Sequence, residues 1–404
     1  MIRHSRAFTN LCFANLCVLG ILVLSVRPLG AEELGIPILA WVGPPESETS
    51  EGRYRELAEA GFTHNFSNFS NTDAMRKALD VAQATGIKQF ISCPELHAAP
   101  EIVAERFKGH PALAGYHLRD EPSAADFPAL AKWATRIQSI DPVHPCYINL
   151  FPNYANGAQL GTATYKEHLD RYLNEVPVPL VSFDHYPVVG HSLRGEWYEN
   201  LEQVSSAAKA SQKPFWAFAL SVAHDPYPIA EIGHLRLQIF SNLAYGAQGI
   251  QYFTYWTVKS PHWNFHQAPI EVDGTRTVVY DRVKQVNSEI RALAKVFHGA
   301  EVLSVGHTGK LPRGTSAFEP TFPVKNLKTG ETGAVISRLA KGNQIAFVIV
   351  NRDLRSKMPL AVTFDPAARI TEVTKEGTTR SISSQDYQSE LTAGDIRVFT
   401  WKKN

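Results

Sequence analysis

Hydrophobic and polar positions follow one pattern from Gly35 to Gly299 and another after it. In the first part, a short apolar run is followed by a stretch with helical periodicity, and this unit recurs eight times. The predicted strands are 36–41, 62–69, 88–93, 113–119, 145–150, 180–184, 214–220 and 249–256. The predicted helices are 53–60, 72–85, 101–108, 124–140 (with Ser123 as N-cap), 165–174, 196–210, 230–245 and 281–296.

Eight strand–helix pairs predict an α/β fold of the (β/α)8 TIM barrel type, which usually needs ~250 residues. A doubly wound open sheet is the alternative. It would place a glycine-rich phosphate-binding turn directly after the first strand, and no such turn follows Ile36–Trp41. The pattern therefore favours the barrel.

The residues after the barrel predict a second, smaller domain over 300–404. Short alternating runs such as Gln344–Asn351 and Ile396–Trp401 are separated by Gly, Asn and Asp turns, which is typical of an all-β sandwich. We interpret this β-sandwich domain as structural support packed against the barrel. Accessory sugar binding is the alternative.

The first thirty-one residues resemble a secretory signal peptide. Arg3 and Arg6 precede an apolar run from Leu11 to Val26, and Ala31 offers a small residue at the cleavage site. The run is shorter than the ~20 residues of a membrane-spanning helix. We therefore expect cleavage after Ala31, a barrel domain over 32–299, and a secreted or periplasmic protein without stable membrane insertion; an uncleaved anchor is the alternative.

Composition excludes several classes of function. Lys plus Arg (40) nearly balances Asp plus Glu (39), so the chain has no polycationic surface and no nucleic-acid partner is expected. The four cysteines form no C-x-x-C pair, so neither a metal nor another cofactor is suggested. The 7 Trp, 14 Tyr and 21 Phe instead indicate a ligand with flat apolar faces.

Catalytic groups of such barrels lie at the carboxyl ends of the strands. The side chains predicted there are acids, amides, imidazoles and aromatic rings: Trp41, Asn65, Glu95, Asp120, Glu121, Asn149, Asp184, His185, Tyr186, Tyr255 and Trp256, with Trp263 in the long irregular stretch 259–279. A histidine-rich metal face and a Schiff-base lysine are missing from this set. The set suits a carbohydrate, whose C–H faces stack on aromatic rings while carboxylates and amides bind its hydroxyls. Arg119, Arg194 and Lys259 would also permit an anionic or sulfated substrate.

The sharpest feature is the sequence Tyr116–Pro122, YHLRDEP, at the end of the fourth strand. Glu121 is well placed to act as a general acid on a glycosidic oxygen. A negative charge on the neighbouring Asp120 would raise the pKa of Glu121. The alternative is a surface turn that caps the following helix.

These residues resemble clan A glycoside hydrolases, most closely the family-42 β-galactosidases. Residues 213–219 are similar to that family's seventh strand, and 244–256 to its passage from helix to eighth strand. The resemblance implies a glycosidase with Glu121 as the acid/base. Two positions depart from the family: Asp120 replaces an asparagine, and Ala219 stands where the resemblance implies a nucleophilic glutamate. Alanine cannot form a glycosyl-enzyme, so the ordinary retaining mechanism is in doubt.

A relocated second carboxylate would restore hydrolysis. Asp184 is the preferred candidate, followed by Glu95 and Asp225. Carboxyl groups ~6.5–9.5 Å apart would act through a water and invert the anomeric configuration, whereas ~5–5.5 Å would indicate retention. Alternatively, Asp184 orients His185 or Arg119, and Glu95 is a turn carboxylate.

The sequence therefore predicts a secreted glycoside hydrolase acting on an oligo- or polysaccharide, with Glu121 and Asp184 as the catalytic pair. One alternative is a non-catalytic carbohydrate-binding barrel that stacks sugars on tryptophans: Trp41, Trp216, Trp256 and Trp263. Another is a lyase or epimerase using His64, His185 or His224. Hydrolysis is favoured because crowding like charges at a strand end is costly for a protein that only binds.

Overall fold

The computed structural model describes residues 35–403, which form one compact unit. The predicted signal peptide lies outside these residues. Within them, no helix has both the length and the apolar character needed to cross a membrane.

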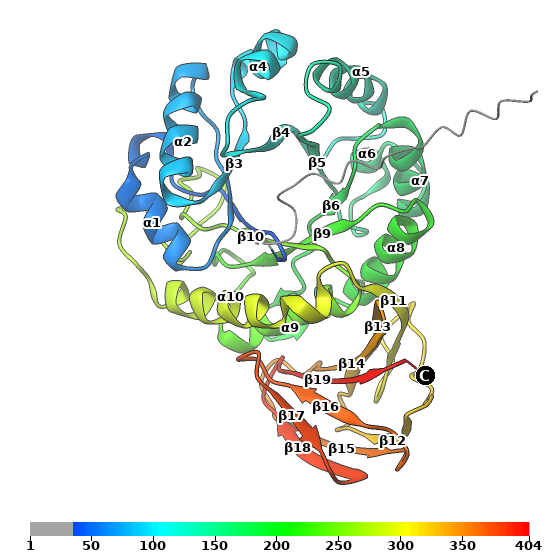
Figure 1. Cartoon of the computed structure of the whole chain (residues 1–404). Helices are drawn as coiled ribbons and strands as arrows, with labels where there is room; N and C mark the ends of the chain where they lie inside the picture. The colour runs from blue at the N-terminus through cyan, green and yellow to red at the C-terminus, as the bar shows by residue number, and fades with distance from the viewer. Residues whose placement is uncertain (1–34, 404) are drawn as a thin grey trace, which may run out of the picture. The chain divides into compact units, whose positions relative to one another are not determined.

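The first part of the described chain is a closed eight-stranded parallel barrel, as Figure 1 shows. This confirms the predicted TIM-barrel fold. Its strands, in chain order, are β1 (Ile38–Trp41), β2 (His64–Phe66), β3 (Lys88–Ile91), β4 (Leu113–Asp120), β5 (Cys146–Leu150), β6 (Val181–Phe183), β9 (Phe215–Leu220) and β10 (Gly249–Phe253). The two short strands β7 (Val188–Val189) and β8 (Ser192–Leu193) form a separate hairpin after β6.

A ring of helices surrounds the barrel (Figure 1). The main helices are α1 (Glu51–Glu59), α2 (Thr72–Thr85), α4 (Pro100–Phe107), α5 (Phe127–Gln138), α7 (Tyr165–Glu175), α8 (Trp197–Ala210), α9 (Ile232–Ala244) and α10 (Val278–Phe297). The short helices are η1 (Glu46–Glu48), α3 (Pro94–Ala98) and α6 (Gly157–Leu160). One predicted cap is wrong: α5 begins at Phe127, because Ser123 lies in a turn in which its hydroxyl accepts from the backbone N–H of Ala125.

Aromatic rings fill the barrel interior. The Trp41 ring packs 4.3 Å from Phe66 and edge-on against Phe218, and Trp216 packs against His64 and Phe90. These side chains belong to a buried cluster distinct from the larger one between strands and helices. The interior is thus a packed core that supports the groups at the carboxyl ends of the strands.

The C-terminal part consists of two antiparallel sheets. The six-stranded sheet contains β11 (Glu301–His307), β13 (Ala334–Lys341), β14 (Gln344–Asn351), β19 (Ile396–Lys402), β16 (Ile370–Val373) and β17 (Thr379–Ile382). The three-stranded sheet contains β12 (Val324–Lys328), β15 (Met358–Phe364) and β18 (Asp386–Leu391). One buried cluster lies within this domain, while other side chains of β13, β14 and β19 join the large cluster of the barrel.

Candidate active site

Three carboxyl groups and an amide meet at the carboxyl ends of β4, β5 and β6. The amide nitrogen of Asn149 donates to Asp120 at 3.0 Å and to Asp184 at 3.1 Å. The Asn149 carbonyl oxygen accepts from the hydroxyl of Ser182 at 2.9 Å, which fixes the orientation of the amide. The backbone N–H of Glu121 donates to the carbonyl of Asn149 at 2.8 Å, and the charge of Glu121 acts on the carboxyl group of Asp184. The structure therefore brings together Glu121, Asp184, Asp120 and Asn149, four of the residues predicted from sequence.

An irregularity in strand β4 sets the direction of the Asp120 and Glu121 side chains. The register with β5 shifts between His117 and Arg119, so Asp120 pairs with Asn149. Such a bulge changes which side chains face inward, and bulges are frequent beside active sites. Directly after it, Glu121 has φ +45°, a left-handed conformation that non-glycine residues seldom adopt. Strain of this kind persists where the surrounding structure fixes it, and it clusters at functional sites.

Burial raises the pKa values of all three acids, and like charges add to the effect at Glu121 and Asp184. Burial is the main cause at Glu121, where the charge of Asp120 adds to it and the pKa rises to about 7. Burial, followed by the charges of Glu121 and Asp120, raises the pKa of Asp184 well above its ordinary value. Asp120 is exposed, yet desolvation raises its pKa too, against the opposing effects of Asn149 and Arg119. Near neutral pH, a large fraction of Glu121 is therefore protonated.

The histidines near these acids are neutral. His185 is 2% exposed and shares a hydrogen bond of 2.9 Å with Asn200 of α8, and burial lowers its pKa to about 3. Burial lowers the pKa of His64 to about 4 inside the barrel, and it also lowers the pKa of His224. A lyase or epimerase that needs a protonated imidazole here gains no support from these surroundings.

Aromatic side chains from several loops surround the acids. Tyr186, after β6, stacks on Phe253 with ring centroids 5.4 Å apart, and its edge meets Tyr227 at 6.1 Å. Tyr154 packs edge-on against His185 at 4.9 Å. Of the tyrosine and phenylalanine rings here, only Tyr186 was predicted from sequence. Phe253 lies in a strand that is buried on both faces, so no alternation of polar and apolar residues shows which way its side chain points. Tyr154 and Tyr227 lie in loops, where no such pattern exists.

Four predicted residues do not reach the carboxyl cluster. Asn65 points toward the helices, where its amide donates to Tyr54 of α1. Tyr255 is wholly buried against Phe62, and Trp256 packs under the guanidinium of Arg53. The eighth strand ends at Phe253, three residues earlier than predicted, so Tyr255 and Trp256 belong to the connection that packs toward α1. Their side chains therefore pack against Phe62 and Arg53 and not beside the acids.

Glu95 is the fourth predicted residue that does not reach the carboxyl cluster. One of its carboxylate oxygens accepts from the backbone N–H of Thr72, the first residue of α2, at 3.2 Å. A carboxylate stabilises a helix at its N-terminus. Glu95 is therefore the turn carboxylate that the sequence left as an alternative, and it does not join Glu121.

The other two predicted tryptophans, Trp41 and Trp263, differ widely in solvent exposure. Trp41 is 5% exposed and lies beneath the acids, with its ring edge-on to His117 at 5.2 Å. Trp263 is 54% exposed in the long connection after β10, where its ring meets His224 edge-on. Trp263 is thus free to stack on a ligand, whereas Trp41 belongs to the packed core.

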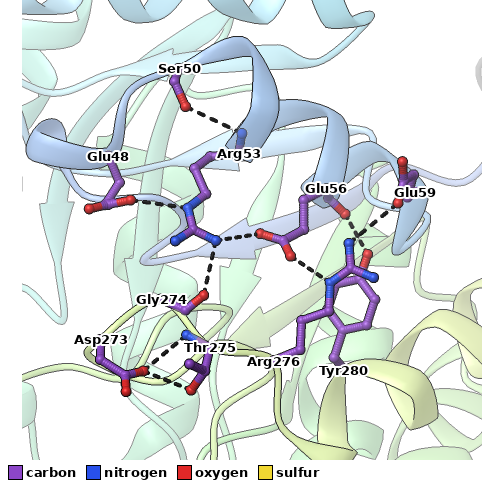
Figure 2. Close-up of polar contacts among 10 residues, drawn as sticks. All are labelled: Glu48, Ser50, Arg53, Glu56, Glu59, Asp273, Gly274, Thr275, Arg276 and Tyr280. Atoms are coloured by element: carbon purple, nitrogen blue, oxygen red, sulfur yellow. Dashed lines mark hydrogen bonds and ion pairs between the residues drawn. The ribbon is translucent and has the colours of Figure 1, made fainter.

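An ion-pair network holds this long connection against α1 (Figure 2). Arg53 of α1 donates to the carbonyl of Gly274 and to Glu56, both at 2.9 Å, and to Glu48 at 3.0 Å. Arg276 pairs with Glu56 and Glu59 from the other side. The network fixes the end of the connection whose middle presents Trp263.

Strand β9 supplies no acid to the site. Its sequence, FWAFAL, contains no carboxylate. Phe218 faces the barrel interior, and Ala219 belongs to the cluster between strands and helices. Within residues 35–403, no group of three or more His, Cys, Asp or Glu side chains is arranged to hold a metal ion.

Comparisons with known proteins bear on the family and the fold of the chain. The family model for β-galactosidase, glycoside hydrolase 42, matches residues 134–293. None of the curated proteins is significantly similar to the chain. The β-galactosidase of G. stearothermophilus, a family-42 enzyme, has a similar structure: the TM-score is 0.64 at 9% identity, covering 91% of this chain and 98% of the other.

Two further solved structures share the fold. The β-galactosidase of Bacillus circulans sp. alkalophilus has a TM-score of 0.60 at 10% identity, over 91% of this chain and 99% of the other. An Anoxybacillus α-amylase has a TM-score of 0.52 at 10% identity, over 92% of this chain and 98% of the other. At such low identity the structures show the fold alone. The family match and the shared barrel confirm the predicted resemblance to the family-42 β-galactosidases and support a glycoside hydrolase.

Proposed function

We propose that the protein is a secreted glycoside hydrolase acting on an oligo- or polysaccharide, with Glu121 as general acid and Asp184 as the second carboxylate. The observation that carries the proposal is the Glu121–Asp184 pair at the carboxyl ends of β4 and β6, in which burial raises the pKa of Glu121 to about 7 and so favours a proton donor near neutral pH. Asp184 adds the second carboxyl group that glycoside hydrolysis requires.

The proposed reaction uses the two carboxyl groups in turn. Protonated Glu121 gives its proton to the glycosidic oxygen as the C–O bond breaks, and ionised Asp184 takes a proton from the water that attacks the anomeric carbon. Because Asp184 acts through the attacking water, this reaction inverts the anomeric configuration, and enzymes that use it hold their two carboxyl groups ~6.5–9.5 Å apart. We therefore expect inversion.

A non-catalytic carbohydrate-binding barrel is the second candidate. One observation favours it: Asp184 accepts a hydrogen bond from Asn149 and is 8% exposed, so its carboxylate is held by the protein itself. In that case the aromatic rings and amides would bind a glycan without cleaving it.

Product analysis and three variants test the proposal. Glu121→Gln and Asp184→Asn should each lower kcat on the cleaved glycan by ~100-fold or more, the usual contribution of a general acid or base. Binding of the same glycan, measured by calorimetry, should remain within about threefold of wild type, because one hydrogen bond to a sugar is worth little net free energy. Glu95→Gln is the matched control and should keep near-normal activity.

The anomeric configuration of the first product, followed by NMR, distinguishes the mechanisms. Inversion is expected, whereas retention would remove Asp184 as a base acting through water. If the wild-type protein releases no sugar from a broad panel of plant, algal and host glycans yet binds one of them, the binding function replaces the hydrolase.

A further inference from the structure

Arg194 lies beside the proposed catalytic pair without a carboxylate partner. It follows strand β8, and its guanidinium is placed over the ring of Tyr154 at 4.6 Å and near that of Tyr227 at 5.7 Å. One of its terminal nitrogens donates to the Tyr227 hydroxyl at 2.8 Å. Two aromatic rings thus fix the position of the cation.

Arg194 lacks the carboxylate partner that two other arginines of the barrel have. Arg53 and Arg236 both pair with glutamates, whereas within residues 35–403 no Asp or Glu lies at ion-pair distance from Arg194. Its Nε atom is buried and, among the described residues, has no hydrogen-bond partner. Buried donors and partly desolvated charges are normally satisfied, so an unpaired one indicates a missing partner.

The orientation of the guanidinium identifies the chemistry of that partner. The guanidinium lies over the Tyr154 ring, and it has further N–H groups besides the one that bonds to Tyr227. The edge of an arginine matches the planar, bidentate geometry of carboxylate and sulfate-like oxyanions. Neutral hydroxyls gain less from such a donor, because hydrogen bonds to charged groups are the stronger ones.

Two aromatic rings in succession connect Arg194 to the neighbourhood of the acids on each side. Tyr154, on one side, packs edge-on at 4.9 Å against His185, the residue after Asp184. Tyr227, on the other side, packs against Tyr186 at 6.1 Å. The charges of Asp184 and Glu121 are both felt at the Tyr154 hydroxyl, whose pKa is raised mainly by burial and then by these charges. Arg194 is therefore placed to contact a sugar unit beside the bond under attack.

We propose that Arg194 binds an anionic substituent, a carboxylate or a sulfate ester, on a sugar unit next to the bond that Glu121 protonates. Arg194 is then a specificity-determining residue that selects acidic glycans. This inference rests on the proposed function for the nature of the ligand, but not on cleavage.

Binding measurements test the inference independently of catalysis. The probes are oligogalacturonides with their carboxyl-reduced forms, and κ-carrageenan oligosaccharides with their desulfated forms, titrated calorimetrically into full-length Glu121→Gln protein and into wild type. We expect one acidic probe to bind about tenfold to a hundredfold more tightly than its neutral form, the effect of a hydrogen-bonded charge pair. The first pair of probes tests a carboxylate and the second a sulfate.

Substitution then assigns the preference to this residue. Arg194→Gln should abolish the preference for the acidic form while binding of the neutral form stays within about threefold, and Arg194→Lys should keep part of it because the charge remains. Arg136→Gln removes an equal charge from an exposed, ion-paired arginine on α5 and should leave the preference unchanged.

The outcomes separate this inference from the proposed function. Equal binding of acidic and neutral probes by wild type, or an unchanged preference in Arg194→Gln, would overturn the role of Arg194 even if neutral glycans are hydrolysed. Preference for an acidic probe that depends on Arg194, without any cleavage, would retain the role and remove the hydrolase.

Discussion

The protonation of Glu121 is controlled by its surroundings more than by its chemical type. Burial favours the neutral acid, and the charge of Asp120 acts in the same direction. The resemblance to family 42 implies an asparagine at position 120, so this chain carries an additional acid beside its proposed proton donor. Asp120 is therefore a means of keeping Glu121 protonated at higher pH.

Asp120→Asn should lower the pKa of Glu121 from about 7, because the substitution removes the charge that opposes ionisation. The alkaline limb of the kcat/KM profile, which reports loss of the acid's proton, should move to lower pH. Asp225→Asn is the control, because Asp225 is exposed and pairs with Asn264. An alkaline limb that stays in place in Asp120→Asn would show that another group carries the proton.

The raised pKa of Glu121 also makes folding stability depend on pH. An acid whose pKa is higher in the folded than in the unfolded protein contributes stability that is complete below its unfolded pKa, near 4.5, and is lost as the pH rises through about 7. Glu121→Gln removes this loss. The variant should therefore melt at a higher temperature than wild type at pH 8, with a smaller difference at pH 5, in calorimetric scans at both pH values. A Tm difference that grows toward acid would contradict the raised pKa.

At the scale of elements, the sequence predicts what depends on local pattern. Helix α2 was predicted over its observed residues, because its polar start and Gly86 end are local signals. The strands were predicted as apolar runs, but an apolar run continues past the hydrogen-bonded strand. The predicted eighth strand was therefore too long: it included Tyr255 and Trp256, although β10 ends at Phe253.

Side-chain direction at the site was harder to predict, because it depends on contacts between strands. The shifted register between β4 and β5, which pairs Asp120 with Asn149, has no signal in one strand alone. Arg194 and Tyr154 come from separate loops and meet only in the folded chain. The acids at the ends of β4 and β6 were predictable because they directly follow apolar runs.

The connection after β10 depends on α1 for its position. Arg53→Ala removes the bonds to Glu48, Glu56 and Gly274 that Figure 2 shows. It also removes the cation over the Trp256 ring. We expect a loss of about 1–3 kcal/mol in the free energy of unfolding and faster tryptic cleavage at Lys259. The measurements are chemical denaturation and limited proteolysis.

Arg55→Ala on the same helix is the control. It removes only an exposed pair with Glu51, so the free energy of unfolding should change by less than about 1 kcal/mol. Equal losses in the two variants would mean that the network does not hold the connection.

At the scale of the whole described chain, helix α9 joins the barrel to the β domain. Every residue from Gly233 to Ala244 is buried, and a helix that is apolar on most sides requires partners on most sides. β9 contacts one face, and β13 and β14 of the six-stranded sheet contact another. Strand β14 is likewise buried on both faces after Gln344, between α9 and the interior of the β domain. The β domain therefore completes the core around the barrel, as the interpretation of structural support requires.

Two glycines allow a test of this packing, because Gly233 is the second residue of α9 and Gly52 is the second residue of α1. A Cβ at Gly233 would lie 3.0 Å from Cβ of Ala393 and 3.2 Å from the carbonyl oxygen of Leu354, both in the β domain, whereas a Cβ at Gly52 would meet nothing closer than 4.0 Å. Gly52→Ala should raise the Tm, since alanine gains up to about 1 kcal/mol over glycine in a helix. Gly233→Ala should lower it, because the backbone of the β domain has to move, and calorimetry on both variants compares them directly. A rise in Tm for Gly233→Ala that equals the rise for Gly52→Ala would mean that the two domains are not packed closely at α9. A fall confined to Gly233→Ala, with a single unfolding transition, would show that the barrel and the β domain unfold as one cooperative unit through this helix.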